Sequence, residues 1–336
     1  MPADLRRPDR RPEDAAVTTA VTVFGCAPEE VALVEQLAPR LGVVATTTSS
    51  PLSEANAGLA RGTRCVSVNH KTPVTGAMIE GLGRVGVRFV STRSIGLDHV
   101  DLHAAERAGV RVEGIAYSPG SVADYTLMLT LMVLRHAKAA VCGAGRDPTH
   151  EPPGRELGDL TVGVVGTGRI GLAVIERLRG FGCRVLTHDL RPADGHAHVP
   201  LDDLLRRSDV VTLHVPLMDA THHLLDRRRI ALLRPGAVLV NTGRGALVDT
   251  AALLAALVAG RLGGAALDVV EDEAEDGAGD KAGDKAGERL RRLDALPNVL
   301  VTPHTAYRTD RAVRDMVQNS LRACVSFERR AVACPT

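Results

Sequence analysis

Residues 162–171, Val-Gly-Val-Val-Gly-Thr-Gly-Arg-Ile-Gly, decide the fold that the sequence predicts. A strand-like run, Val162–Val165, is followed by glycines at positions 166, 168 and 171 and then by an amphipathic stretch that reaches Arg179. A strand, a Gly-x-Gly-x-x-Gly turn and a helix in this order form the dinucleotide-binding fingerprint when an acidic residue ends the next strand. Asp189 stands at that place.

The residues of the turn have distinct expected tasks. Gly166 permits the tight turn, Gly168 lets a pyrophosphate approach the backbone, and Gly171 lets the helix pack closely on the strand. The helix N-terminus favours the phosphate charge. Asp189 would accept hydrogen bonds from ribose hydroxyls and repel a phosphate there, which favours NAD(H) over NADP(H), although Arg191 would soften the repulsion. The alternative is that Asp189 is only a solvated acid at a strand end.

Short β-branched runs alternate with helical patterns along most of the chain, which is typical of α/β folds with parallel sheets. In the first half the predicted strands are Thr22–Phe24, Cys65–Val68 and Val87–Ser91. In the second half they are Val162–Val165, Arg184–Thr187, Val210–His214, Val238–Asn241, Ala265–Leu267 and Val299–Val301. A long apolar helix is predicted from Ser121 to about Lys138.

The composition narrows the class of protein. The 336 residues suggest two domains, 45% of them are apolar, and 41 basic side chains against 40 acidic ones leave a net charge of +1. Neither nucleic acid nor an anionic membrane is an expected partner of so balanced a chain, and no apolar run is long enough to span a bilayer. The six cysteines form no CxxC pair, which predicts reduced thiols, a cytoplasmic protein and no metal site.

Polar residues follow several predicted strands of the second half. They are His214-Val215-Pro216, Asn241-Thr242-Gly243-Arg244-Gly245, Asp268 and Pro303-His304. Taken singly, His214 would only cap its strand, Arg244 would be a surface charge in a turn, and His304 would be a structural histidine. Because the carboxyl ends of parallel strands meet at one edge of a sheet, we expect these residues to converge on one crevice.

These motifs resemble the D-isomer-specific 2-hydroxyacid dehydrogenases, from about Val21 to Arg330. The segments that carry the resemblance are 163–171, Asn241 to Asp249, Gly264 to Val269 and Thr302 to Ala306. The segments Ser91 to Gly96 and Ala116 to Pro119, together with Gly243, are most similar to the D-lactate dehydrogenases of vancomycin-type glycopeptide-resistance clusters. Those members of the family make D-lactate for altered cell-wall precursors.

The resemblance implies a catalytic set of Arg244, Glu273 and His304. His304 would donate the proton, Glu273 would favour its imidazolium form, and Arg244 would bind the substrate carboxylate and polarise the carbonyl. The family's spacing after Asp268 selects Glu273, whereas spacing alone leaves Glu271 open. The substrate would also meet Ile95, Gly96 and Tyr117. The expected cofactor-binding residues are Gly166, Gly168, Arg169, Ile170, Gly171, Asp189, His214, Val215, Pro216, Thr242, Gly243, Asp268 and His304.

The resemblance also implies two Rossmann-like or flavodoxin-like domains with the active-site cleft between them. Residues 1–118 and 309–336 would form the substrate-binding domain, with residues 1–20 disordered. Residues 119–308 would form the NAD-binding Rossmann domain, with a mobile low-complexity loop at 271–292. In members of the family the helix that corresponds to the one beginning at Ser121 contributes to a dimer interface, so the resemblance implies a homodimer; its leucine run, too apolar for a solvent-exposed helix, fits this expectation.

The expected function is NADH-dependent reduction of a 2-oxoacid, first of all pyruvate, to the D-2-hydroxy acid. One alternative is another 2-oxoacid, such as glyoxylate, hydroxypyruvate, or a branched or phosphorylated compound. A phosphorylated substrate would need extra cations near Ile95 and Gly96, and Arg93 and Lys71 are candidates. A second alternative is an NAD(H)-sensing binding protein on the same fold.

Overall fold

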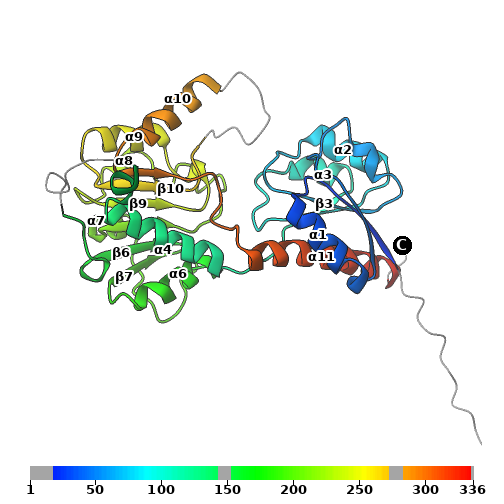
Figure 1. The fold of residues 1–336 in the computed structure, drawn as a ribbon, viewed down its shortest axis with the longest axis horizontal. Helices are drawn as coiled ribbons and strands as arrows, with labels where there is room; N and C mark the ends of the chain where they lie inside the picture. The colour runs from blue at the N-terminus through cyan, green and yellow to red at the C-terminus, as the bar shows by residue number, and fades with distance from the viewer. Residues whose placement is uncertain (1–17, 143–152, 272–282, 334–336) are drawn as a thin grey trace, which may run out of the picture. The chain divides into compact units, whose positions relative to one another are not determined.

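The computed structural model describes residues 18–142, 153–271 and 283–333, and it divides into two compact units (Figure 1). Unit 1 comprises Met1–His70, Val74–Ile115 and Met316–Thr336, and unit 2 comprises Lys71–Pro73 and Ala116–Asp315. The sequence places residues 116–118 and 309–315 in the first domain, whereas both stretches, Tyr117 included, belong to unit 2. None of the described helices combines the length and the apolar character needed to cross a bilayer.

Unit 1 is built on a five-stranded parallel sheet with the order β2-β1-β3-β4-β5. Its strands are β1 (Thr19–Val23), β2 (Val43–Thr47), β3 (Cys65–Val68), β4 (Phe89–Thr92) and β5 (Arg111–Glu113). This is the flavodoxin-like strand order. The expectation of disorder through residue 20 is wrong for Thr19 and Ala20, which pair with Val43 and Val44 in the sheet. Pairing and burial of Thr19 against β2 order the start of the strand.

Helices cover both faces of the unit 1 sheet. They are α1 (Pro28–Leu37), α2 (Gly76–Arg84), α3 (Leu102–Arg107) and α11 (Asp310–Ala333), whose C-terminal part belongs to this unit. Side chains alternate along each strand, so Cys65 packs in the core shared with α1 and α11, whereas Val66 packs in the core shared with α2 and α3. Such a sheet, buried on both sides, requires the continuous apolar strands of the sequence.

Unit 2 is built on a six-stranded parallel sheet with the order β11-β10-β9-β8-β6-β7. Its strands are β6 (Thr161–Val165), β7 (Arg184–His188), β8 (Val210–Leu213), β9 (Val238–Asn241), β10 (Gly264–Leu267) and β11 (Val299–Val301). The strand order reverses at β6, because β7 lies on one side of it and β8 on the other. Ligands of open α/β sheets bind at such a reversal, outside the carboxyl ends of the strands.

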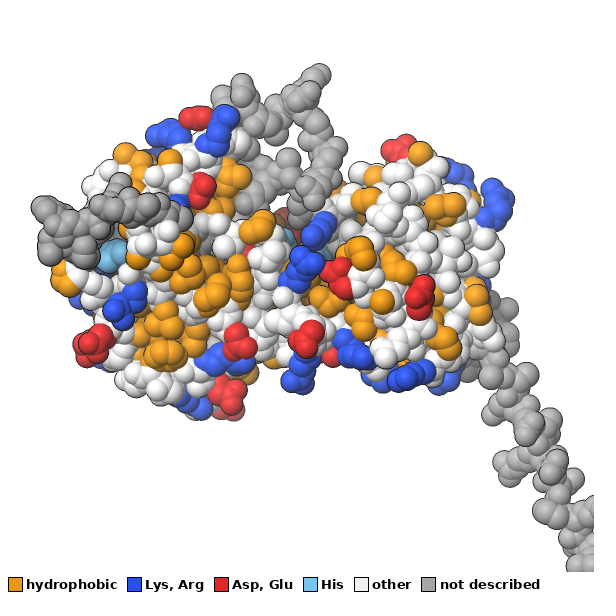
Figure 2. Space-filling view, viewed as in Figure 1, with side chains coloured by type: hydrophobic (Ala, Val, Ile, Leu, Met, Phe, Trp, Pro, Cys, Tyr) orange, Lys and Arg blue, Asp and Glu red, His pale blue; other side chains and the backbone are white. Residues whose placement is uncertain are grey.

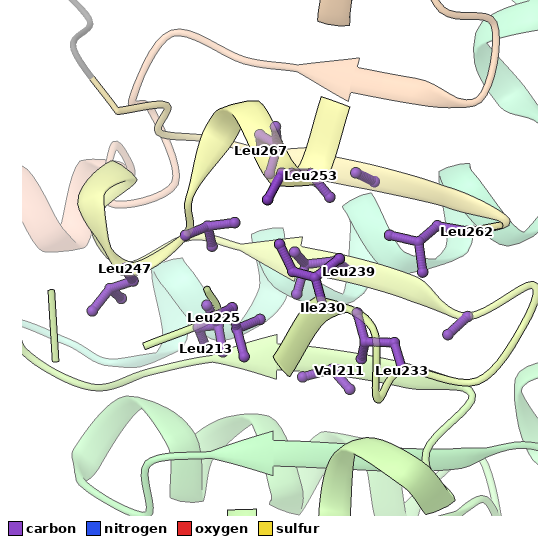
Figure 3. Close-up of a cluster of buried hydrophobic side chains, with 14 of the residues drawn as sticks. Val211, Leu213, Leu225, Ile230, Leu233, Leu239, Leu247, Leu253, Leu262 and Leu267 are labelled. Carbon is purple, nitrogen blue, oxygen red and sulfur yellow. The ribbon is translucent and has the colours of Figure 1, made fainter. Parts of the chain in front are cut away.

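Helices cover both faces of this sheet (Figure 1), and a hydrophobic core lies on each face. The helices of the unit are α4 (Gly120–Leu134), α5 (Ala137–Cys142), α6 (Arg169–Arg179), α7 (Leu201–Arg207), α8 (Arg227–Ile230), α9 (Thr250–Val258) and α10 (Gly283–Asp294). Val210 faces the core beneath α4 and α6, and its neighbour Val211 faces the core beneath α7, α8 and α9. Figure 3 shows the second core, where leucines of strands and helices interdigitate. The cores hold the strand ends, and therefore the loops after them, in fixed places.

The prediction of a mobile loop at 271–292 is wrong for its second half. Residues 272–282 lie outside the described part, but Gly283–Asp294 forms helix α10, which packs against α9 and β11. Leu290 and Leu293 lie three residues apart on one helical face, and Leu293 is fully buried in the core. This burial stabilises the helix, although its charged, glycine-containing sequence does not predict one.

Candidate active site

The glycine-rich turn connects β6 to α6 and has the geometry that its residue types predict. Gly166 adopts a left-handed φ of 98°, and a Cβ there would lie 2.4 Å from the carbonyl oxygen of His214. A Cβ on Gly171 would lie 1.9 Å from the carbonyl oxygen of Gly166, so only glycine lets α6 approach the strand. A Cβ on Gly168, the N-cap of α6, would meet no atom within 4 Å. The open space at this helix N-terminus suits a pyrophosphate.

Asp189 ends β7 beside the turn and is held as a carboxylate. One of its oxygens accepts hydrogen bonds from the backbone N–H of Thr167 (2.6 Å) and from its hydroxyl (3.1 Å). The other accepts from the backbone N–H of Arg191 at 2.8 Å. Burial alone would raise the pKa of Asp189, but the hydrogen bonds from Arg191 and Thr167 outweigh it and lower the pKa below its usual value. The carboxylate is therefore fixed and charged where the fingerprint requires it.

His214 follows β8 and faces the glycine-rich turn through its backbone. Its N–H donates to the carbonyl oxygen of Val165 at 2.7 Å, and its Nε2 lies 2.9 Å from the hydroxyl of Thr212. Burial lowers the pKa of His214 to about 4, so its imidazole is neutral at pH 7. Val215 is partly buried beside it, and Pro216 is exposed.

The turn after β9 presents Thr242, Gly243 and Arg244. Asn241 shapes it from both sides, because its side chain accepts from the N–H of Gly243 (3.0 Å) and donates to the carbonyl oxygen of Arg244 (2.8 Å). The buried hydroxyl of Thr242 lies 2.9 Å from that of Thr126 on α4. These bonds fix the backbone from which the Arg244 guanidinium extends.

Asp268 directly follows β10 and is buried at the carboxyl end of that strand. Its carboxylate accepts hydrogen bonds from the hydroxyl of Thr302 (2.7 Å) and from the backbone N–H groups of Thr305 (2.9 Å) and Ala306 (2.8 Å). Its carbonyl oxygen accepts from the backbone N–H of His304 at 2.9 Å. Burial raises the pKa of Asp268, and these hydrogen bonds partly oppose the rise. These bonds show that Asp268 fastens the segment that carries His304; its assignment to the cofactor stays a prediction.

His304 itself adopts a left-handed backbone conformation, with φ of 49°. For a residue with a side chain this conformation is uncommon and costs roughly 1 kcal/mol or more, so the bonds around Asp268 are needed to hold it. The imidazole meets the ring of Tyr307 edge to face, with 6.2 Å between the ring centroids. This conformation was not predictable from the motif alone.

Tyr117 lies in the same part of unit 2. Its carbonyl oxygen accepts a hydrogen bond from Arg169 at 3.2 Å. Burial raises the pKa of the Tyr117 hydroxyl, the nearby charges of Arg244 and Arg169 lower it, and that of Asp268 raises it further. The structure therefore brings Tyr117 close to Arg244 and to the Asp268 cluster that carries His304.

The other predicted substrate contacts, Ile95 and Gly96, follow β4 in unit 1. Ile95 is exposed, and the carbonyl oxygen of Gly96 accepts from the hydroxyl of Ser94 at 2.8 Å. Arg93 just before them is only 1% exposed. Its guanidinium donates to Glu30 (2.9 Å), to Ser67 (3.0 Å) and to the carbonyl oxygens of residues 24 and 25. Arg93 is therefore not available as a cation for a phosphorylated substrate, because its guanidinium donors are bonded at the ends of the sheet strands.

Glu273 lies outside the described residues. The structure therefore gives no geometry that decides whether Glu273 or Glu271 is the catalytic glutamate. Glu271 is described, and its Oε1 lies 2.5 Å from the Nε2 of His223. Sequence reasoning missed this pair. His223 lies between β8 and α8, whereas Glu271 follows β10, and no spacing rule relates these two positions in the sequence.

Comparison with known proteins identifies the family. Residues 126–306 match the D-isomer specific 2-hydroxyacid dehydrogenase, NAD binding domain. A D-specific alpha-keto acid dehydrogenase of Enterococcus faecium is 47% identical over 313 residues, which cover 92% of this chain and 97% of that protein.

Solved structures agree over both units. The structure of D-2-hydroxyisocaproate dehydrogenase aligns with a TM-score of 0.82 and 32% identity, covering 93% of this chain and 98% of that one. The D-lactate dehydrogenase of Aquifex aeolicus, solved with NAD and lactic acid, aligns with a TM-score of 0.80 and 30% identity over 93% and 96% of the two chains. The predicted α/β fold with two parallel-sheet domains is confirmed. The chain belongs to the D-isomer specific 2-hydroxyacid dehydrogenases and is an NAD-dependent enzyme of that family.

Proposed function

We propose that this enzyme reduces pyruvate to D-lactate with NADH. The observation that carries the proposal is the grouping in unit 2 of Arg244, Tyr117 and the His304 segment around the buried carboxylate of Asp268. A guanidinium, a phenol and an imidazole are the groups needed to bind a carboxylate and to protonate a carbonyl oxygen. A relative with this fold was solved with NAD and lactic acid, which supports lactate as the product.

The residues around the glycine-rich turn fit NAD(H). The open space at Gly168 and the N-terminus of α6 would take the pyrophosphate, with the backbone of Arg169 and Ile170 beside it. The charged Asp189 would accept the ribose hydroxyls and disfavour a 2′-phosphate. His214, Val215, Pro216, Thr242 and Gly243 border the same strand ends and would contact the rest of the cofactor. When bound, NADH supplies the hydride for the reduction.

The proton comes from His304. As imidazolium it would donate to the carbonyl oxygen, on which negative charge develops. Glu273 is proposed to stabilise this charged form of the ring. Arg244 would bind the substrate carboxylate through two N–H groups and polarise the carbonyl, a task that its planar guanidinium suits better than a lysine ammonium.

The backbone N–H groups of Ile95 and Gly96 are proposed to bind the substrate carboxylate, and the Tyr117 hydroxyl to assist. The Arg93 guanidinium already donates to Glu30, Ser67 and two carbonyl oxygens. A second anionic group on the substrate would therefore find no free donor on Arg93. Of the two candidate cations for a phosphorylated substrate only the exposed Lys71 remains, and we propose an unphosphorylated 2-oxoacid as the substrate. Unit 1 is accordingly proposed as the substrate-binding domain.

The physiological role that we propose is supply of D-lactate for glycopeptide-resistant cell-wall precursors. The support is the resemblance of residues 91–96, 116–119 and 241–249 to the D-lactate dehydrogenases of vancomycin-type resistance clusters. Deleting the gene in its native host should then lower the D-lactate content of the precursors and the vancomycin resistance together. Unchanged precursors would contradict this role while leaving the enzymatic activity intact.

The active form is proposed to be a homodimer that pairs through α4. Apolar residues dominate this helix and Met128 on it is 41% exposed, while the exposed Asp124 pairs with Arg177 of α6. Figure 2 shows hydrophobic side chains gathered where Figure 1 draws α4 and α6, and Leu172 and Phe181 are exposed in the same region. A surface of this kind favours a protein partner over water. Light scattering after size exclusion should give twice the 35.5 kDa chain mass, and a monomer would contradict the proposal.

The decisive substrate test is NADH oxidation by the purified enzyme with pyruvate, with NADPH in parallel and the lactate enantiomer identified. D-lactate formed faster with NADH than with NADPH supports the proposal. Turnover of glyoxylate, hydroxypyruvate or branched 2-oxoacids, with none of pyruvate, would replace the substrate but keep the reaction class.

A further inference from the structure

Two consecutive histidines and a glutamate converge in unit 2. His222 and His223 lie in the connection between β8 and α8, and Glu271 follows β10. The Nε or Nδ atoms of the two rings and a carboxylate oxygen of Glu271 all lie within 4.8 Å of one another. The proposed reaction uses none of these side chains.

The backbone is bent so that both rings point the same way. In an extended chain consecutive side chains point to opposite sides. His223 instead adopts a left-handed φ of 47°, and the two ring centroids lie 4.1 Å apart with 31° between the ring planes. Backbone hydrogen bonds from His223 to Ala246 (2.8 Å) and from Leu225 to Leu247 (2.9 Å) hold this bend. A costly conformation is thus maintained to place two imidazoles side by side.

Both rings face the same carboxylate oxygen. The Nε2 of His223 lies 2.5 Å and the Nε2 of His222 lies 4.0 Å from Oε1 of Glu271. A hydrogen bond to Glu271 explains the position of the His223 ring but not that of the His222 ring. The Glu271 side chain is 14% exposed, whereas that of His222 is 54% exposed. The Glu271 carboxylate at the base of the cluster is therefore mostly shielded from water, whereas the His222 ring is exposed to it.

We infer that His222, His223 and Glu271 form a binding site for a divalent transition-metal ion of the zinc class. Imidazole nitrogens and a carboxylate oxygen are ligands that Zn²⁺ prefers, and three protein ligands leave a fourth position for water. Ligand atoms around a tetrahedral ion with bonds of about 2.0–2.1 Å stand about 3.3 Å apart. The present distances from Oε1 of Glu271, 2.5 Å to His223 and 4.0 Å to His222, lie on either side of that value, so metal binding would require the His222 ring and the Glu271 carboxylate to rotate.

The ion would join two segments of unit 2 directly, those of residues 222–223 and 271, and a third through a hydrogen bond. His223 is bonded to Ala246, which lies in the turn that carries Arg244, and Glu271 lies three positions after Asp268. Its role is structural, since the proposed proton donor and carboxylate ligand are other residues. The proposal does not depend on the substrate assignment.

The test is calorimetric titration of the full chain with Zn²⁺, compared between the wild type, His222→Gln and a matched control, His103→Gln. Both replaced rings are exposed, so both variants should fold, which circular dichroism checks. We expect about one ion per chain in the wild type and the control, and an affinity at least roughly 10-fold weaker in His222→Gln. Because heat of binding is measured, the result does not depend on turnover.

Two outcomes would overturn the proposal. One is a wild type that binds no Zn²⁺, in which case His223 and Glu271 form only a hydrogen-bonded pair. The other is a His222→Gln variant that binds as tightly as the wild type, which would move any metal to other residues. A Glu271→Gln variant should lose affinity as well, because the amide supplies a weaker ligand than the carboxylate.

Discussion

Replacing Asp268 by asparagine tests how the protein positions His304. The two carboxylate oxygens of Asp268 accept from Thr302, Thr305 and Ala306, and these bonds hold the segment around His304. An asparagine keeps one acceptor oxygen and turns an NH2 group toward donors on the other side. At least one buried N–H or O–H group then loses its partner.

The magnitude follows from these hydrogen bonds. A hydrogen bond to a charged group contributes about 1.5–3 kcal/mol. The neutral amide recovers part of this, because burial already disfavours the carboxylate and raises the pKa of Asp268. We therefore expect Asp268→Asn to lower the free energy of unfolding by about 2 kcal/mol. A displacement of His304 by about 1 Å should lower kcat by about 10²-fold.

The assay pairs urea unfolding with steady-state NADH oxidation. Asp194→Asn, at an exposed loop position, is the matched control and should leave both quantities unchanged. The KM for NADH should change less than kcat, because the weakened hydrogen bonds belong to the His304 segment. Wild-type kcat together with wild-type stability in Asp268→Asn would refute a positioning role for Asp268.

Four further predictions concern the cofactor side of unit 2. Asp189→Ala should remove the preference for NADH over NADPH, and an unchanged ratio of kcat/KM values would separate Asp189 from the cofactor. Gly171→Ala should destabilise the fold by about 1–3 kcal/mol in urea unfolding, because its Cβ would lie 1.9 Å from a carbonyl oxygen. Gly168→Ala should instead unfold like the wild type yet bind NADH more weakly in a fluorescence titration, and tight binding would place the pyrophosphate elsewhere. Because the pKa of His214 falls from 6.5 to about 4 on folding, the unfolded chain binds more protons between these values, so stability should fall by up to about 3 kcal/mol from pH 6.5 to pH 4. His214→Gln should flatten this pH dependence, and an equally steep loss in the variant would contradict the burial argument.

Local rules sufficed where residue type and backbone geometry are tightly coupled. Gly166 and Gly171 were predictable because a left-handed turn and a close helix approach exclude any side chain. The six strands of unit 2 were predictable because a sheet buried on both faces needs continuous apolar runs. In unit 1, β2 (Val43–Thr47) and β5 (Arg111–Glu113) were missed because both strands are short and partly exposed, so their patterns resemble loops.

Other features depend on tertiary contacts that the sequence pattern does not show. Helix α10 forms because Leu290 and Leu293 pack against the core, which a charged and repetitive segment does not reveal. Arg93 resembles a ligand-binding cation in the sequence, but residues far from it in the chain consume its donors. The left-handed conformations of His223 and His304 likewise depend on hydrogen bonds from distant strand ends.

The central claim is that His304 donates the proton in a pyruvate reduction that yields D-lactate. The most direct measurement compares His304→Gln with the wild type at saturating pyruvate and NADH, with NADH affinity determined separately by fluorescence. If His304 donates the proton, the variant should turn over about 10²–10⁴-fold more slowly with nearly unchanged NADH affinity. A variant that keeps most of the wild-type turnover would contradict it.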